Sequence, residues 1–114
     1  MHISKDLVAA AATPLVLSIL AKGDSYGYAI LKQVSAMSDG RLEWTDGLLY
    51  PLLHRLERSG YLESVWGESP EGRRRKYYRI TDQGRAELAE QRRQWDAVVD
   101  TLRDAWHRMP ALEG

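Results

Sequence analysis

The chain has 114 residues, of which 44% are hydrophobic and 28% are charged, and its 16 basic residues balance its 16 acidic ones. This length and composition predict a single globular domain with a modest core. The sequence has no apolar run of about 18 residues and no basic segment ahead of an apolar core, so we expect neither a membrane span nor a secretion signal. Because it has no cysteine, disulfides and thiolate metal sites are excluded, which fits a cytoplasmic protein.

The first part of the chain predicts two helices. Residues 5–21 are rich in alanine and leucine, which favour helix, and Thr13-Pro14 predicts a kink or a restart within that helix. We expect Ser25 to cap a second helix, in which apolar residues recur at helical spacing until Ser38-Asp39-Gly40 ends it. The short run Leu42–Trp44 could form a single edge strand.

A third helix is predicted to begin at Thr45-Asp46, where the threonine is a good cap and the acid lies in the first turn. Its buried side consists of leucines at helical spacing: Leu49, Leu52, Leu53 and Leu56. Pro51 lies inside this helix, at a cost of about 3 kcal/mol unless the first turn is distorted. The opposite side carries Gly47, Pro51, His54 and Arg58, flanked by Tyr50 and Arg55. Ser59-Gly60 ends the helix.

A basic hairpin is predicted next. Two strand-like runs, 61–66 and 72–81, are joined by a loop that contains glycine and proline. We expect Tyr78 and Ile80 to face the core, and the alternate residues to form the outer face: Arg73, Arg75, Tyr77 and Arg79. Four consecutive basic residues, Arg73–Lys76, repel one another. Their grouping therefore indicates an anionic partner in spite of the zero net charge.

The last predicted element is a long helix from Thr81-Asp82 to about Met109, where Pro110 stops it. Apolar residues recur in it at heptad spacing, interrupted by Arg92. A helix of roughly 40 Å, at 1.5 Å per residue, is too long to pack on so small a core. We therefore predict that it dimerises through Leu88, Trp95, Val99, Leu102, Trp106 and Met109.

This order of elements predicts a mainly α member of the α+β class, namely a winged helix-turn-helix with a long C-terminal dimerisation helix. We expect a DNA-binding domain over residues 1–81 and a dimerisation helix over residues 82–114, together forming one compact unit.

Several short motifs, in this order and spacing, resemble the PadR family of transcriptional regulators. The resemblance covers about residues 10–95 and most closely matches the subfamily with a single C-terminal helix. It implies a homodimer that binds DNA and senses small molecules. The motifs are Gly27-Tyr28-Ala29-Ile30, Leu49-Tyr50-Pro51, Arg55-Leu56-Glu57, Trp66-Gly67-Glu68 and the run Gly72–Thr81.

The chain departs from the family's common pattern at two positions. Leu48 stands where a threonine is common, and His54 stands where a basic residue is common. Both changes remove potential contacts to phosphate or base, so the operator sequence of relatives cannot be carried over.

For DNA binding, we expect the third helix to enter the major groove and the hairpin to contact phosphates or a minor groove. Some of these residues also have a purely structural interpretation: Tyr50 as a partly buried aromatic, Tyr77 as a cover for the hairpin, and Arg55 or Arg58 as a partner of Glu57. The predicted DNA-binding residues are Thr45, Leu48, Tyr50, Pro51, His54, Arg55, Arg73, Arg74, Arg75, Lys76 and Tyr77.

The resemblance also implies a ligand site, because Trp95 falls where multidrug-sensing relatives place a tryptophan that lines a pore at the dimer interface. Trp95 could form a flat aromatic wall for a small aromatic or cationic effector, Val99 could line the same site, and Asp96 and Asp100 could supply negative charge. The alternative is that Trp95 is only an interface core residue.

The sequence indicates no enzyme, cofactor or metal site. The three histidines lack metal-ligand spacing, and there is no catalytic triad pattern, phosphate-binding glycine loop or paired-carboxylate site. We therefore predict a sequence-specific DNA-binding regulator, specifically a homodimeric repressor that a small molecule releases from its double-stranded operator. Two alternatives stay open: a winged-helix module that binds protein rather than DNA, and a drug-binding protein without a regulatory role.

Overall fold

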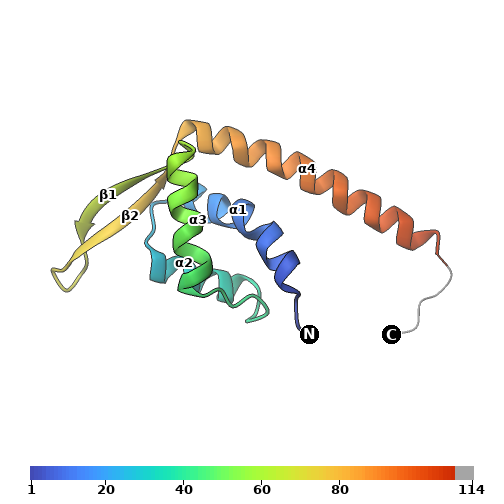
Figure 1. The fold of residues 1–114 in the computed structure, drawn as a ribbon, viewed down its shortest axis with the longest axis horizontal. Coiled ribbons are helices and arrows are strands. Elements are labelled where there is room, and N and C mark those ends of the chain that lie inside the picture. The colour runs from blue at the N-terminus through green and yellow to red at the C-terminus, as the bar shows by residue number, and fades with distance from the viewer. Residues whose placement is uncertain (110–114) are drawn as a thin grey trace.

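A computed structural model describes residues 1–109 and has a mainly helical α+β fold with a two-stranded antiparallel sheet (Figure 1). Three helices, a β-hairpin and a long final helix follow one another, so the predicted winged helix-turn-helix class is confirmed. No helix in the described part of the chain is long and apolar enough to cross a membrane. The elements are α1 (Lys5–Ala21), α2 (Gly27–Met37), α3 (Asp46–Arg58), β1 (Leu62–Glu68), β2 (Arg74–Ile80) and α4 (Asp82–His107).

Helix α1 has the predicted bounds and supplies much of the core. The side chain of Ser4 caps it by accepting a hydrogen bond from the Leu7 amide (3.3 Å). The helix continues through Pro14 without the restart that the sequence allowed. Its buried side consists of Ala12, Val16, Leu17, Ile19 and Leu20.

The start of α2 differs from the prediction. Ser25 does not cap this helix; Tyr26 occupies the cap position and makes no side-chain capping bond. Ser25 instead pairs with Tyr78 of β2, donating its amide to the Tyr78 carbonyl (3.2 Å) and accepting from the Tyr78 amide (2.7 Å). The edge strand expected at Leu42–Trp44 is also wrong, because these residues are irregular and Trp44 is buried in the core. On the free edge of β2, the backbone amide and carbonyl of Tyr78 are instead paired with Ser25, which precedes α2.

Helix α3 begins as predicted. The Thr45 hydroxyl accepts a hydrogen bond from the Leu48 amide (3.3 Å), and all four predicted leucines are buried. Pro51 lies inside the helix, which continues past it to Arg58.

The hairpin of β1 and β2, termed the wing (residues 62–80), has the predicted facing. Leu62 is opposite Ile80 and Ser64 is opposite Tyr78. Tyr78 and Ile80 are buried as expected, with 2% and 6% of their surface exposed. Trp66 lies further along the same face as Leu62 but is 55% exposed, because the wing projects beyond the core (Figure 1).

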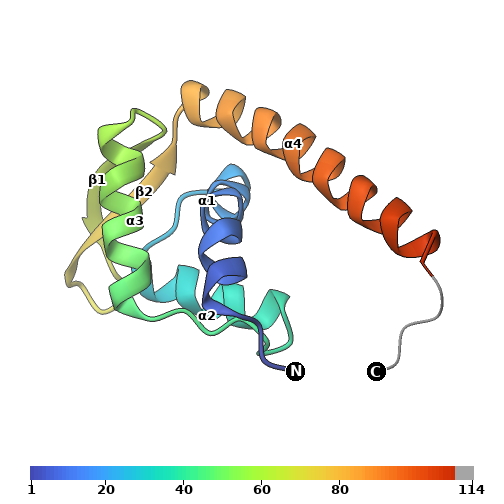
Figure 2. The same ribbon diagram turned by 45° about the vertical axis from the view of Figure 1, so that its right-hand side comes forward.

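Helix α4 is tied to the wing and then leaves the core. The Thr81 side chain accepts a hydrogen bond from the Gly84 amide (3.0 Å) and donates one to the Gly60 carbonyl (2.6 Å). Leu88 packs against the core, and the helix then extends past α1 (Figures 1 and 2). The only residue of α4 that is fully buried is Gly84. The predicted stop at Pro110 lies outside the described residues.

We predict that Gly84→Ala destabilises the protein. A Cβ at this position would overlap the carbonyl oxygen of Tyr61 and would lie 2.8 Å from Cγ1 of Ile80, so backbone has to shift. We expect the free energy of unfolding to fall by about 1–3 kcal/mol, measured by urea denaturation. Gly47→Ala is the control, because a Cβ there meets nothing closer than 3.7 Å. Equal stability of Gly84→Ala and the parent chain would contradict this packing.

Candidate nucleic-acid interface

Helix α3 lies next to the wing (Figures 1 and 2), and its outward side is exposed from the first turn to the last. We call Gly47, Pro51, His54 and Arg58 the outer strip; all four are exposed and lie opposite the buried leucines. The first two residues have short side chains, and the last two carry polar groups. The strip therefore allows close approach of a partner at one end and offers hydrogen-bond donors at the other.

Two predicted DNA-binding residues lie on the α1 flank of α3 instead. The Arg55 guanidinium donates a hydrogen bond to the Thr13 hydroxyl of α1 (3.3 Å). Leu48 is half-buried on the same flank. Both residues line a hollow of about 420 Å³ between α1 and α3, and Gly47, Pro51 and Arg58 of the outer strip line it too, so the α1 flank and the outer strip are continuous.

Tyr50 lies on the other flank of α3, against the start of α2. Its ring packs over Gly27, where a Cβ would overlap the tyrosine hydroxyl, and 38% of the residue remains exposed. Tyr50 is thus a partly buried aromatic whose hydroxyl lies at the first turn of α2. The structural interpretation of Tyr50, as a partly buried aromatic, is therefore compatible with its interpretation as a DNA-binding residue.

Glu57 joins α3 to the wing. Its carboxylate accepts a hydrogen bond from the Ser64 hydroxyl of β1 (2.6 Å) and lies 4.0 Å from the Lys76 ammonium of β2. The expected alternative, a pair between Glu57 and Arg55 or Arg58, does not form in the described chain, where Glu57 pairs with Lys76. This carboxylate therefore ties α3 to both strands of the wing.

Arg75 and Tyr77 hold the wing against the start of α2. The Arg75 guanidinium lies 3.6 Å from the ring centroid of Tyr26 and donates to the Tyr77 hydroxyl (2.8 Å). The Tyr77 ring meets the Tyr26 ring edge-on, with centroids 5.6 Å apart. The hydrogen bond with Tyr77 raises the pKa of Arg75 above its usual value. Tyr77 thus covers the hairpin, as its structural interpretation expected.

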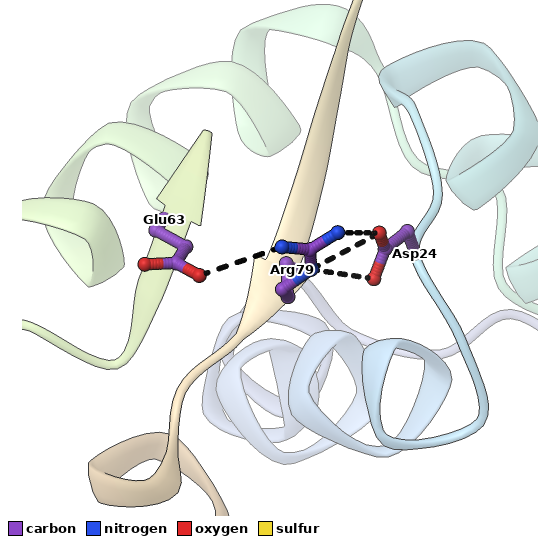
Figure 3. Close-up of polar contacts among 3 residues, drawn as sticks. All are labelled: Asp24, Glu63 and Arg79. Carbon is purple, nitrogen blue, oxygen red and sulfur yellow. Dashed lines mark hydrogen bonds and ion pairs between the residues drawn. The ribbon is translucent and has the colours of Figure 1, made fainter. Parts of the chain in front are cut away.

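Arg79 is neutralised by two carboxylates, as Figure 3 shows. Its guanidinium lies 2.9 Å from Asp24, in the loop before α2, and 3.9 Å from Glu63 of β1. The hydrogen bond with Asp24 raises the pKa of Arg79. Asp24 and Arg79 are 55 residues apart in the chain, so no local sequence signal could have paired them.

Three cations of the wing, Arg73, Arg74 and Arg75, have no acidic partner within residues 1–109, and of these only Arg75 is held by the Tyr26 ring and the Tyr77 hydroxyl. Arg73 is exposed at the turn, and the Arg74 guanidinium lies 4.6 Å from the ring centroid of Trp66. The basic run therefore has two parts: Arg75 and Lys76 are engaged within the protein, and the two residues before them are available to an anion.

The predicted dimerisation residues follow one side of α4 with decreasing burial. Leu88, Trp95 and Val99 are half-buried, whereas Leu102, Trp106 and Met109 are 42%, 57% and 45% exposed. Val98, which heptad spacing did not select, is also 50% exposed. Asp96 and Asp100 are exposed on the same helix. The outer half of α4 thus carries an apolar surface that residues 1–109 of the single chain leave uncovered.

Comparison with known proteins gives consistent similarities. The sequence profile of the transcriptional regulator PadR-like family matches residues 16–90. A transcriptional regulator from Clostridium thermocellum has a TM-score of 0.82 and 33% identity, over 90% of this chain and 96% of that chain. A PadR family regulator from Eggerthella lenta has a TM-score of 0.76 and 35% identity, over 91% and 88%. The Escherichia coli transcriptional regulator YqjI is 27% identical over 78% of this chain and 41% of its own length.

We predict that Arg75→Gln loosens the wing, because it removes the contact with the Tyr26 ring and the hydrogen bond to Tyr77. Hydrogen exchange of the β1 and β2 amides should become faster, and the denaturation midpoint should fall. Arg73→Gln is the matched control and should change neither quantity. Equal exchange rates in the two variants would show that Arg75 does not anchor the wing.

Proposed function

Because the chain belongs to the PadR-like family of transcriptional regulators, we propose that it is a homodimeric, sequence-specific repressor. Regulators of this family bind DNA and are not enzymes. One observation carries the proposal for this chain: the outer strip of α3 lies beside a wing that presents two cations, Arg73 and Arg74, without an acidic partner in the described part of the chain. Double-stranded DNA offers a groove for the first feature and phosphates for the second. Its place of action would be the cytoplasm, with the chromosome.

The outer strip is the proposed reading surface in the major groove. Gly47 and Pro51 let the helix backbone approach the base edges, and His54 and Arg58 extend from the next turns. Arginine pairs with the O6 and N7 acceptors of guanine. We propose that the strip supplies sequence discrimination and that Thr45 and Tyr50 at its edges donate to phosphates. Leu48 and Arg55, on the α1 flank, have a smaller role at the edge of the groove.

The wing is the proposed phosphate anchor. Arg73 and Arg74 contribute charge that does not depend on sequence. Arg75, Lys76 and Tyr77 act mainly by holding the wing at a fixed distance from α3, through Tyr26 and Glu57. In this proposal the wing supplies affinity for DNA of any sequence, and α3 supplies the specificity for one sequence.

The second copy is proposed to cover the apolar side of α4. Leu102 and Trp106 are exposed on a helix that no other described element covers at that end (Figure 1), and a patch of this kind indicates an interface. Pairing of two α4 helices would set the separation of the two outer strips. For successive major grooves this separation has to be about 34–36 Å.

The effector site is proposed at the same helix pair. Trp95 and Val99 are half-buried in the single chain, and Asp96 and Asp100 are exposed next to them. A small aromatic or cationic molecule between the two helices would change the separation of the outer strips and so weaken DNA binding.

We predict that replacing both Arg73 and Arg74 with glutamine flattens the salt dependence of DNA binding. Each lost phosphate contact should lower the slope of log K against log[salt] by about 0.9. The measurement is fluorescence anisotropy with a labelled duplex, first selected from a random pool, at several salt concentrations.

Arg93→Gln with Arg103→Gln is the control, because it removes the same charge from α4 at positions off the heptad seam. This control should keep the parent slope. Absence of binding to any duplex at low salt would overturn the proposed function itself.

We predict that Leu102→Glu separates the dimer. A carboxylate at the centre of an apolar helix pair should raise the dissociation constant about a hundredfold or more, measured by analytical ultracentrifugation. Arg103→Glu, at the neighbouring position off the seam, should leave the dimer intact. A chain truncated after Gln91 should be monomeric, and a stable dimer of that fragment would refute the α4 interface.

A further inference from the structure

A second cavity lies under the start of the recognition helix, away from Trp95. Its volume is about 720 Å³, within the range of small-molecule sites, about 300–1,000 Å³. Its wall comes from four places: residues 1–3, the N-terminal part of α1, the connection between α2 and α3, and the first turn of α3. The apolar part of this wall includes Ile3, Val8, Ala9, Trp44 and Leu48.

Trp44 gives this cavity an unusual wall. The residue is 7% exposed. Its indole nitrogen is the buried side-chain nitrogen or oxygen that, within residues 1–109, has no hydrogen-bond partner. Buried donors are nearly always paired. Because Trp44 also lines the cavity, an acceptor that enters there and displaces the atoms covering this nitrogen would pair with it.

The charges around the cavity are balanced and unpaired. Lys5 and Arg41 face Asp39 and Glu43 in its lining, and none of the four forms an ion pair with another residue of 1–109. A wall of this kind has no net charge to select an anion or a cation. Together with the apolar part of the wall, this balance of charge favours an uncharged, mainly apolar molecule that carries one polar group.

One wall of the cavity has no hydrogen bond to the rest of the described chain. Met1, His2 and Ile3 line it, lie outside any helix, and form no hydrogen bond with other residues of the described chain. The indole nitrogen is covered by protein atoms, so a ligand reaches it only when part of the wall moves. Movement of this segment gives a ligand room without any change in the core.

We propose that this cavity binds a flat, mainly apolar small molecule that carries a neutral hydrogen-bond acceptor, with the Trp44 indole as donor. The site touches Thr45 and Leu48, which are the cap and the first turn of α3. Occupancy therefore acts on the recognition helix within one protomer. This regulatory role depends on the proposed function, whereas binding to the cavity does not.

The test uses quinoline, a flat molecule with one ring-nitrogen acceptor, titrated into the full-length ¹⁵N-labelled chain. The four tryptophans give four indole N–H signals, which single Trp→Phe variants assign. We expect the Trp44 signal to shift saturably and further than those of Trp66, Trp95 and Trp106. Naphthalene, which has the same shape without the acceptor, should bind at least about tenfold more weakly, as expected for a hydrogen bond worth about 1.4 kcal/mol.

Ala9→Phe should abolish the Trp44 shift, because the added ring fills the cavity from an exposed position of α1. Ala86→Phe, an exposed position of α4 off the heptad seam, is the matched control and should leave the shift unchanged. The proposal is overturned if only the Trp95 signal responds, if no signal saturates, or if Ala9→Phe keeps the Trp44 shift. Equal affinity for naphthalene would overturn the role of the acceptor.

The regulatory part has a separate measurement. Quinoline at saturation should change the affinity for the selected duplex about fivefold or more, and Ala9→Phe should remove this response. An unchanged duplex affinity with an occupied cavity would overturn the regulation alone. Failure to bind any duplex would overturn the proposed function, while the Trp44 shift would still establish the site.

Discussion

The position of the wing depends on backbone pairing along both edges of β2. Tyr78 lies opposite Ser64 of β1, its backbone amide and carbonyl bond to Ser25 before α2, and its side chain is buried in the core. A hairpin of two strands alone is only marginally stable in water. The pair with Ser25 adds a backbone partner on the edge of β2 that β1 leaves free. It also brings Asp24 and Tyr26 next to Arg79 and Arg75. The wing is therefore fixed to α2 as well as to α3.

This anchoring divides the cations of the wing by function. Arg75, Lys76 and Arg79 each have a partner within the protein, so their charge is partly used to hold the fold. Exposed ion pairs of this kind contribute little stability individually. Their value lies in fixing the direction of the wing, which leaves Arg73 and Arg74 extended from a rigid base. A cation that extends from a rigid base loses less conformational entropy when it binds a phosphate.

The sequence predicted those elements whose signals are local. Caps at Thr45 and Thr81, leucine spacing in α3 and alternation in β2 gave the right helices, strands and facing. It failed at Ser25, because a serine before a helix is a common cap and the competing partner, Tyr78, is more than 50 residues away. The same distance hid the Asp24–Arg79 pair. Charge counting showed that residues 73–79 are basic, but only the packing of Tyr26 and Glu57 separates anchoring cations from free ones.

The contacts of α3 also show where a ligand can act on it. Tyr50 packs on α2, Arg55 bonds to α1 and Glu57 bonds to the wing, so the later turns move only with the whole domain. The first turn is different: it contributes Leu49 to the core, and the hydrogen bond from its Leu48 amide goes to its own cap, Thr45. The cavity beside Trp44 touches this turn and no later one. A molecule bound there thus meets the least constrained part of the recognition helix, next to Gly47, where the outer strip begins.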